Sequence, residues 1–166
     1  IIANLENNDK INITKELLDQ YLGEARFHRA YQYSVLIFHF GDIPFYQGKL
    51  SLEEGFKMGR TKKEIVLQSI YEDYDYAASV LPDTYSDYKR ATKGAALAMK
   101  ARIALYMSDY EVAKAAAKAV IDMGQYKLHP DFGDLFLSST KSSPEYIFVI
   151  PRSVELGLTA PWINQT

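Results

Sequence analysis

With 166 residues, 48% of them hydrophobic and 24% charged, the chain has the length and composition of one globular domain with a real core. Its formal net charge of −2 leaves no basic excess to pair with phosphates, which argues against nucleic acid as a partner. The absence of cysteine excludes disulfides, thiolate metal sites and a cysteine nucleophile, and no apolar run of about 18 residues is present that could span a membrane.

The N-terminal part of the chain predicts one long helix. Residues 1–5, IIANL, resemble the tail of a helix already under way, so we expect the sequence to be a piece of a longer protein. Thr14 is a good N-cap, and a helix is predicted over residues 15–39. Gly41 and Pro44 should end it, because glycine favours the conformation that closes a helix and proline cannot continue one.

A second helix is predicted after a connecting segment. Residues 48–59 carry three glycines and are interpreted as a loop. The sequence TKKE at residues 61–64 has the form of a capping box, so the helix should begin after Thr61. It should continue to Leu81, because Pro82 stops it. One face is apolar at helical spacing and consists of Leu67, Ile70, Tyr74, Ala77 and Leu81.

The alanine-rich stretch 90–122 predicts an antiparallel helical hairpin. Residues 92–107 are small and apolar on most sides, and residues 110–122 carry an apolar stripe. That stripe consists of Ala113, Ala116, Ala117, Val120 and Ile121. Ser108 is predicted to cap the second helix in a capping box with Glu111, which leaves only a tight turn. The alanines should bring the helix axes close and leave no cavity between them. The hairpin resembles those of tetratricopeptide repeats.

The remainder of the chain is richer in loops. Gly124 is a predicted helix end, and residues 131–137 can form one helical turn. The run EYIFVI at residues 145–150 predicts a short strand. The predicted fold class is therefore mainly α, with tetratricopeptide-like helical hairpins, a loop-rich segment and one short strand toward the C-terminus. Residues 1–125 should form the helical scaffold and residues 126–166 the loop-rich segment, where we expect a ligand to bind.

Several stretches together resemble the SusD/RagB family. The sequence GEARFHRAY at residues 23–31 is similar to the family's GEARFLRAY helix, and FGDIP at residues 40–44 is similar to the FGDVP that follows it. RATKGAA at residues 90–96 matches a helix start of the family. Weaker pieces are the helix before Pro82, DFGDLF at 131–136 and IF at 147–148. Because their order and spacing agree, the sequence is identified as an internal fragment of a member, residues 1–166 being part of one larger SusD-like domain.

The resemblance implies a surface-exposed lipoprotein of the outer membrane of Gram-negative bacteria. Family members bind glycans or other nutrients and hand them to a TonB-dependent, SusC-like transporter. The implied fold is a tetratricopeptide-like scaffold whose loops carry an oligosaccharide site, attached to the membrane only through a lipid anchor absent from this fragment. Neither catalytic activity nor a cofactor is implied. Sugar contacts follow no motif in this family, so no site residue is carried over by position.

Candidate catalytic and metal-binding residues form no coherent pattern. His28 and His39 are eleven residues apart on one predicted helix, about three turns, and cannot share an ion, while His129 stands alone. A run of carboxylates is predicted to lie on a solvated helix face and not to form a glycosidase pair: Glu72, Asp73 and Asp75. We therefore expect no enzyme activity and no metal.

Aromatic side chains are the remaining functional signal. A sugar ring presents apolar C–H faces that can stack on Trp or Tyr, and its hydroxyls pair with Asn, Asp or Arg. Trp162 and Asn164 combine these groups in an irregular segment and are the predicted ligand contacts. The tyrosine-bearing loop 83–89 has the same composition. Two functions stay open: a nutrient-binding lipoprotein, and a helical-repeat scaffold for protein–protein contacts without a small-molecule ligand.

Overall fold

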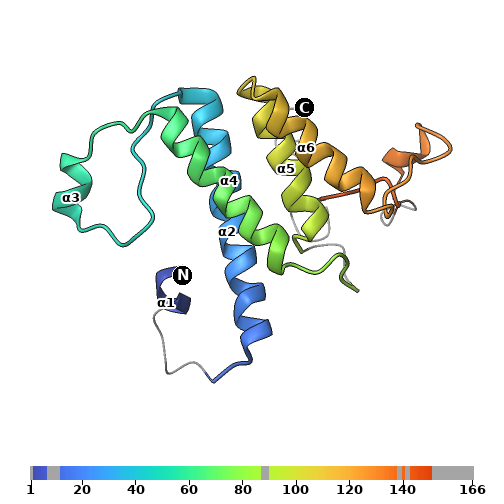
Figure 1. The fold of residues 1–166 in the computed structure, drawn as a ribbon, viewed down its shortest axis with the longest axis horizontal. Helices are drawn as coiled ribbons and strands as arrows, with labels where there is room; N and C mark the ends of the chain where they lie inside the picture. The colour runs from blue at the N-terminus through green and yellow to red at the C-terminus, as the bar shows by residue number, and fades with distance from the viewer. Residues whose placement is uncertain (1, 7–11, 87–89, 138–139, 141–142, 151–166) are drawn as a thin grey trace, which may run out of the picture.

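The computed structural model describes residues 2–6, 12–86, 90–137, 140 and 143–150, and these form a helical fold (Figure 1). The elements in chain order are α1 (Ile2–Glu6), α2 (Lys15–Phe40), α3 (Leu52–Lys57), α4 (Lys63–Val80), α5 (Lys93–Tyr106), α6 (Tyr110–Asp122) and the 3-10 turn η1 (Asp134–Phe136). Helix α4 packs between α2 and α5, and α6 packs on α5. The prediction of a mainly α, tetratricopeptide-like arrangement is confirmed. No described helix has the length and apolar character that crossing a bilayer requires.

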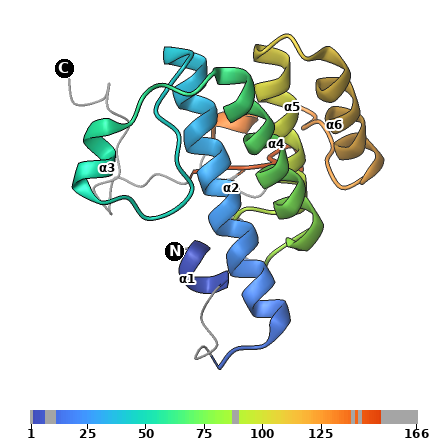
Figure 2. The ribbon, with the colours of Figure 1, turned by 60° about the vertical axis from the view of Figure 1, so that its left-hand side comes forward.

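Helix α2 begins and ends as its sequence predicts. The Thr14 side chain accepts a hydrogen bond from the Leu17 amide at 3.3 Å. At the other end, Gly41 adopts φ of 68° and its amide donates to the Ile37 carbonyl at 3.0 Å. Residues 2–5 are helical as predicted, and the helix they belong to, α1, lies against α2 (Figure 2).

Helix α3 was not predicted, because its segment carries glycines and reads as a loop. Ser51 and Glu54 form a capping box there, with the Ser51 amide donating to Glu54 at 2.8 Å and the Glu54 amide donating to Ser51 at 3.2 Å. No residue of α3 is buried, and the helix projects from the others in both ribbon views (Figures 1 and 2). This short helix therefore depends on its local cap and not on packing.

The predicted capping box at Thr61 is wrong, although α4 itself is confirmed. Thr61 pairs through its backbone with Ile43 in an antiparallel bridge, with N–O distances of 2.8 and 3.2 Å. The free amide of Lys63 instead donates to the Asp42 side chain at 3.0 Å. Local spacing could not reveal this cap, since the acceptor lies 21 residues upstream.

The α5–α6 hairpin forms as predicted, but its turn differs. Ser108 has φ of 63° and does not cap α6; Asp109 does, accepting from the Val112 amide at 3.4 Å. The buried stripe of α6 is also narrower than predicted, because Ala117 and Ile121 are exposed. Tight packing on α5 is confirmed by its fully buried alanines, Ala95, Ala96 and Ala104.

The predicted strand at residues 145–150 is wrong: this described segment contains no strand. A strand needs a partner ladder, and here the segment instead places Phe148 edge-on against the fully buried Phe27, with ring centroids 5.1 Å apart. The run of apolar residues thus reflects burial against the helices.

Tyr126 also packs against the helices, at Gly94 of α5, where an added Cβ would lie 2.7 Å from the Tyr126 ring. The predicted helical turn near 131–137 is confirmed as η1.

Candidate functional site

The predicted ligand contacts Trp162 and Asn164 lie outside the described residues, so their role stays a prediction. In the loop 83–89, Tyr85 is described and is packed against α2. Its hydroxyl donates to Glu24 at 3.3 Å, and the Arg90 guanidinium lies 4.6 Å from its ring centroid. Burial raises the pKa of Tyr85. This tyrosine therefore anchors the loop and does not present a free stacking face.

Two concave surfaces lie on different faces of α2. On a helix, residues three or four positions apart lie on the same face, and adjacent residues point in different directions. The two sets of α2 residues therefore face different sides of the helix. The first surface uses residues 25, 28, 29, 32, 33 and 36 of α2, and the second uses residues 31, 34, 35, 38 and 39. We call the first the α2 groove and the second the aromatic pocket.

The α2 groove, of about 580 Å³, runs between α1, α2 and the segment that follows Pro44. Tyr33 shapes it by donating a hydrogen bond to the Tyr46 carbonyl at 2.7 Å and accepting one from the Tyr46 amide at 3.2 Å. Exposed His28 and Gln32 offer polar groups along α2, and Lys49 offers a cation on the opposite side. The groove can therefore take a hydrogen-bonding ligand or a further segment of polypeptide.

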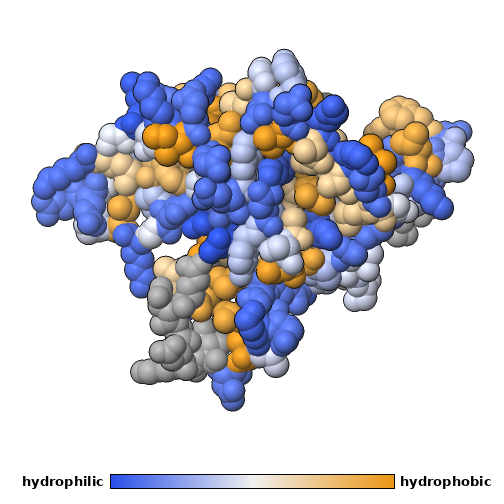
Figure 3. All heavy atoms as spheres, viewed as in Figure 1, coloured by the Kyte–Doolittle hydropathy of each residue, from blue (hydrophilic) through white to orange (hydrophobic). Residues whose placement is uncertain are grey.

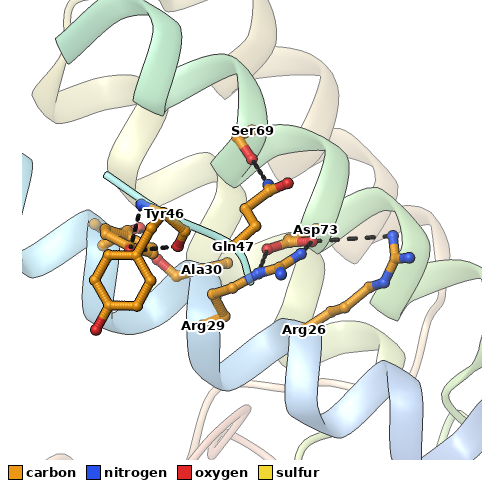
Figure 4. Close-up of polar contacts among 9 residues, drawn as sticks. Arg26, Arg29, Ala30, Tyr46, Gln47, Ser69 and Asp73 are labelled. Carbon is orange, nitrogen blue, oxygen red and sulfur yellow. Dashed lines mark hydrogen bonds and ion pairs between the residues drawn. The ribbon is translucent and has the colours of Figure 1, made fainter. Parts of the chain in front are cut away.

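A buried ion pair lies beside the α2 groove (Figure 4). Arg29 of α2 donates two hydrogen bonds to Asp73 of α4, at 2.6 and 2.7 Å, and Arg26 lies 4.0 Å from the same carboxylate. Asp73 is only 3% exposed, which corrects the prediction of a solvated face; Glu72 and Asp75 are exposed as predicted. Gln47 adds a bond to Ser69 of α4 at 2.5 Å. Together these contacts hold α2, α4 and the groove segment in one arrangement.

The aromatic pocket, of about 210 Å³, lies between α2, α4 and α5. Phe38 and Tyr106 flank it with ring centroids 4.8 Å apart and an angle of 33° between their planes. Tyr74 and Ser34 are buried beneath, with their hydroxyl oxygens 3.5 Å apart, and burial raises the pKa of Tyr74 to about 12. This pocket lies at the edge of the scaffold, where longer side chains replace the alanines, and not at the alanine-rich contact between α5 and α6.

Polar groups on the rim of the aromatic pocket are open to solvent. Arg102 and His39 are both exposed. Hydrophobic and hydrophilic residues are interspersed over the face of the molecule that Figure 3 shows. Within the described ranges, no three His, Cys, Asp or Glu side chains gather in a way that would hold a metal ion. Both concave surfaces combine apolar walls with polar side chains, as ligand-binding surfaces do.

This combination defines a helical-hairpin scaffold with aromatic and polar binding surfaces, and comparisons with known proteins give its family. Residues 2–105 match the SusD-like family described as "Starch-binding associating with outer membrane". The chain belongs to this SusD-like family.

Individual relatives agree with this assignment. The chain is 30% identical over 152 residues to SusD-like protein P25 of Formosa agariphila, covering 89% of this chain and 28% of that protein. It is similar to the crystal structure of a SusD-like protein from Bacteroides fragilis, with a TM-score of 0.84 and 26% identity, covering 95% of this chain and 32% of the other. A SusD-like carbohydrate binding protein from the same species gives a TM-score of 0.80 and 27% identity, covering 89% and 29%. The chain thus spans under a third of the length of these relatives.

Proposed function

We propose that the full-length protein is a glycan-binding lipoprotein at the outer-membrane surface that delivers its ligand to a TonB-dependent, SusC-like transporter. The observation that carries this proposal is the match of residues 2–105 to a family described as starch-binding and associated with the outer membrane. The carbohydrate-binding relative from Bacteroides fragilis supports the same ligand class. The described fragment would supply the rigid scaffold of the protein.

The proposed function is binding without catalysis. A glycosidase needs two carboxylates that face each other across the bond to be cleaved, one of them able to give up a proton. The buried carboxylate, Asp73, is held in two hydrogen bonds by Arg29 and is not free for that role. Glu72 and Asp75 are exposed on α4, and Asp75 is bonded to Lys100 at 2.7 Å. These contacts support a structural role for the acidic cluster.

The experiment is a binding survey with the full-length protein. Affinity electrophoresis against starch, laminarin and other soluble glycans should show retarded migration with at least one glycan, confirmed by calorimetry with the matching oligosaccharide. Product analysis after long incubation should show no hydrolysis. Failure to bind any glycan would favour the alternative, a protein-interaction scaffold, and release of sugar products that Glu72→Gln abolishes would overturn the non-catalytic assignment.

The transporter partner and the predicted ligand contact need separate tests. Purification of the tagged full-length protein from detergent-solubilised outer membranes should bring a TonB-dependent transporter with it, and its absence under conditions that keep glycan binding would contradict the delivery role. Trp162→Ala should weaken glycan binding with little change in the melting temperature, because a stacking residue on a loop supplies affinity and little core packing. A lower melting temperature with unchanged affinity would instead assign Trp162 to the core.

A further inference from the structure

We propose that the aromatic pocket is a carbohydrate subsite that holds one ring of an uncharged glycan against Phe38 and Tyr106. The inference rests on the proposed function, since it names a place where the glycan binds. It concerns residues far in sequence from the predicted contacts Trp162 and Asn164. Its grounds are the exposed aromatic pair, the polar rim, the charge around the pocket and the pocket's size.

The aromatic pair is both exposed and fixed in position. Phe38 is 49% exposed and Tyr106 is 52% exposed, although the two rings contact each other. Each ring comes from the last turn of a long helix, α2 or α5, so the backbone beneath it is rigid. An exposed, preorganised aromatic surface loses little conformational entropy when a ligand covers it. Such a surface suits the apolar C–H face of a sugar ring, which buries aromatic area while its hydroxyls stay at the rim.

Polar groups stand where those hydroxyls would lie. Tyr31, His39 and Arg102 line the same pocket. Among the described residues, Arg102 forms no ion pair, and its guanidinium donates a hydrogen bond to the Met99 sulfur at 3.9 Å. The floor differs, because the Ser34 hydroxyl already donates to the Ala30 carbonyl at 2.7 Å. Ligand hydrogen bonds should therefore form at the rim, with the apolar walls below.

The charge around the pocket favours an uncharged ligand. Arg102 contributes one positive charge, and no Asp or Glu is among the described residues that line the pocket. However, α2 ends at Phe40 and α5 ends at Tyr106, so the C-terminal ends of two helices meet beside it. Each helix C-terminus acts as roughly half a negative charge, and together they offset the arginine. A volume of about 210 Å³ is below the usual range for whole oligosaccharide-sized ligands, so one ring is held and the rest of the chain extends outward.

The test measures affinity in the full-length protein with maltoheptaose and laminarihexaose as probes. Phe38→Leu keeps apolar bulk and removes the aromatic face, and should weaken binding of the recognised probe roughly two- to twelvefold. Tyr106→Phe keeps the ring and should bind nearly as well as the wild type, whereas Tyr106→Leu should lose affinity like Phe38→Leu. Phe56→Leu is the matched control, because Phe56 is 82% exposed on α3 and lies outside the pocket.

The outcomes separate this inference from the proposed function. If the wild-type protein binds neither the probes nor any glycan of the survey, the proposed function fails and the subsite fails with it. If the wild type binds while Phe38→Leu and Tyr106→Leu bind equally well, the subsite alone is overturned. A melting temperature that falls well below that of Phe56→Leu, with unchanged affinity, would also overturn it. That result would show that another part of the full-length chain covers the aromatic pair.

Discussion

Replacing Asp73 by alanine should be among the most damaging single changes to the helical scaffold. The carboxylate is 3% exposed and accepts two hydrogen bonds from Arg29, whose side chain is 16% exposed. Removing one partner of a buried pair costs roughly 3–5 kcal/mol, because the other charge is left without compensation. Water can reach part of the Arg29 side chain, so we expect about 3 kcal/mol, the lower end of that range.

Urea denaturation of the full-length protein, followed by circular dichroism, measures this cost. Asp75→Ala is the matched control on the same helix, because Asp75 is 58% exposed in its side chain, and its partner Lys100, although only 16% exposed, has a flexible stem that can turn the ammonium group into the solvent. That change should cost less than about 1 kcal/mol. The double variant Arg29→Met with Asp73→Leu should recover most of the stability, since an apolar pair can replace a buried ion pair. Equal, small losses for Asp73→Ala and Asp75→Ala would refute the reasoning.

The other predictions concern packing, capping and pH. Ala116→Leu should cost about 1–3 kcal/mol by overpacking the α5–α6 contact, while Ala117→Leu, one residue on and exposed, should be nearly neutral; equal thermal melts would contradict the observed face. Asp109→Ala should cost about 0.5–2 kcal/mol through the lost α6 cap, whereas Ser108→Gly should raise stability because glycine adopts positive φ without strain; denaturation midpoints decide both. Burial raises the pKa of Tyr74 from 10.0 to about 12, so the unfolded chain loses this proton first. Between pH 9 and 11 this residue should therefore remove roughly 1.3 kcal/mol of stability in total, and the fall should be smaller in Tyr74→Phe, as measured by denaturation over that range.

Much of the scaffold follows from local sequence, whereas two of the helix caps do not. The apolar spacing of α4 and the alanines of α5 act within a few turns, so periodicity finds them. The caps of α4 and α6 were missed for different reasons. Asp42 caps α4 from 21 residues away, and Asp109 caps α6 because the tight turn forces its neighbour Ser108 into positive φ. Local spacing cannot describe an acceptor that only the fold brings near.

The burial of Asp73 and the aromatic pocket show the same limit at the level of the site. Asp73 has exposed acidic neighbours on the same helix. It differs from them only in lying on the face of α4 that packs against α2, where Arg29 binds it. Phe38 and Tyr106 are 68 positions apart in the sequence, and neither belongs to a motif. Their pairing depends on the lateral placement of α2 against α5, which periodicity does not fix. The predicted contacts Trp162 and Asn164 were chosen by composition alone and stay a prediction.

The stretches that carry the family resemblance are the ones that join helix to helix. Glu24 of GEARFHRAY pairs with Arg90 of RATKGAA at 2.7 Å, and Arg29 of the first stretch pairs with Asp73 of α4. The Arg29–Asp73 pair restricts what can replace it, because either partner left alone in that buried position is costly, whereas the Glu24–Arg90 pair is only partly buried. Side chains that point outward, as Phe38 does, are free of that restriction. A sequence pattern of this family should therefore identify the scaffold well and the ligand poorly, and glycan specificity should reside in exposed residues that the pattern does not contain.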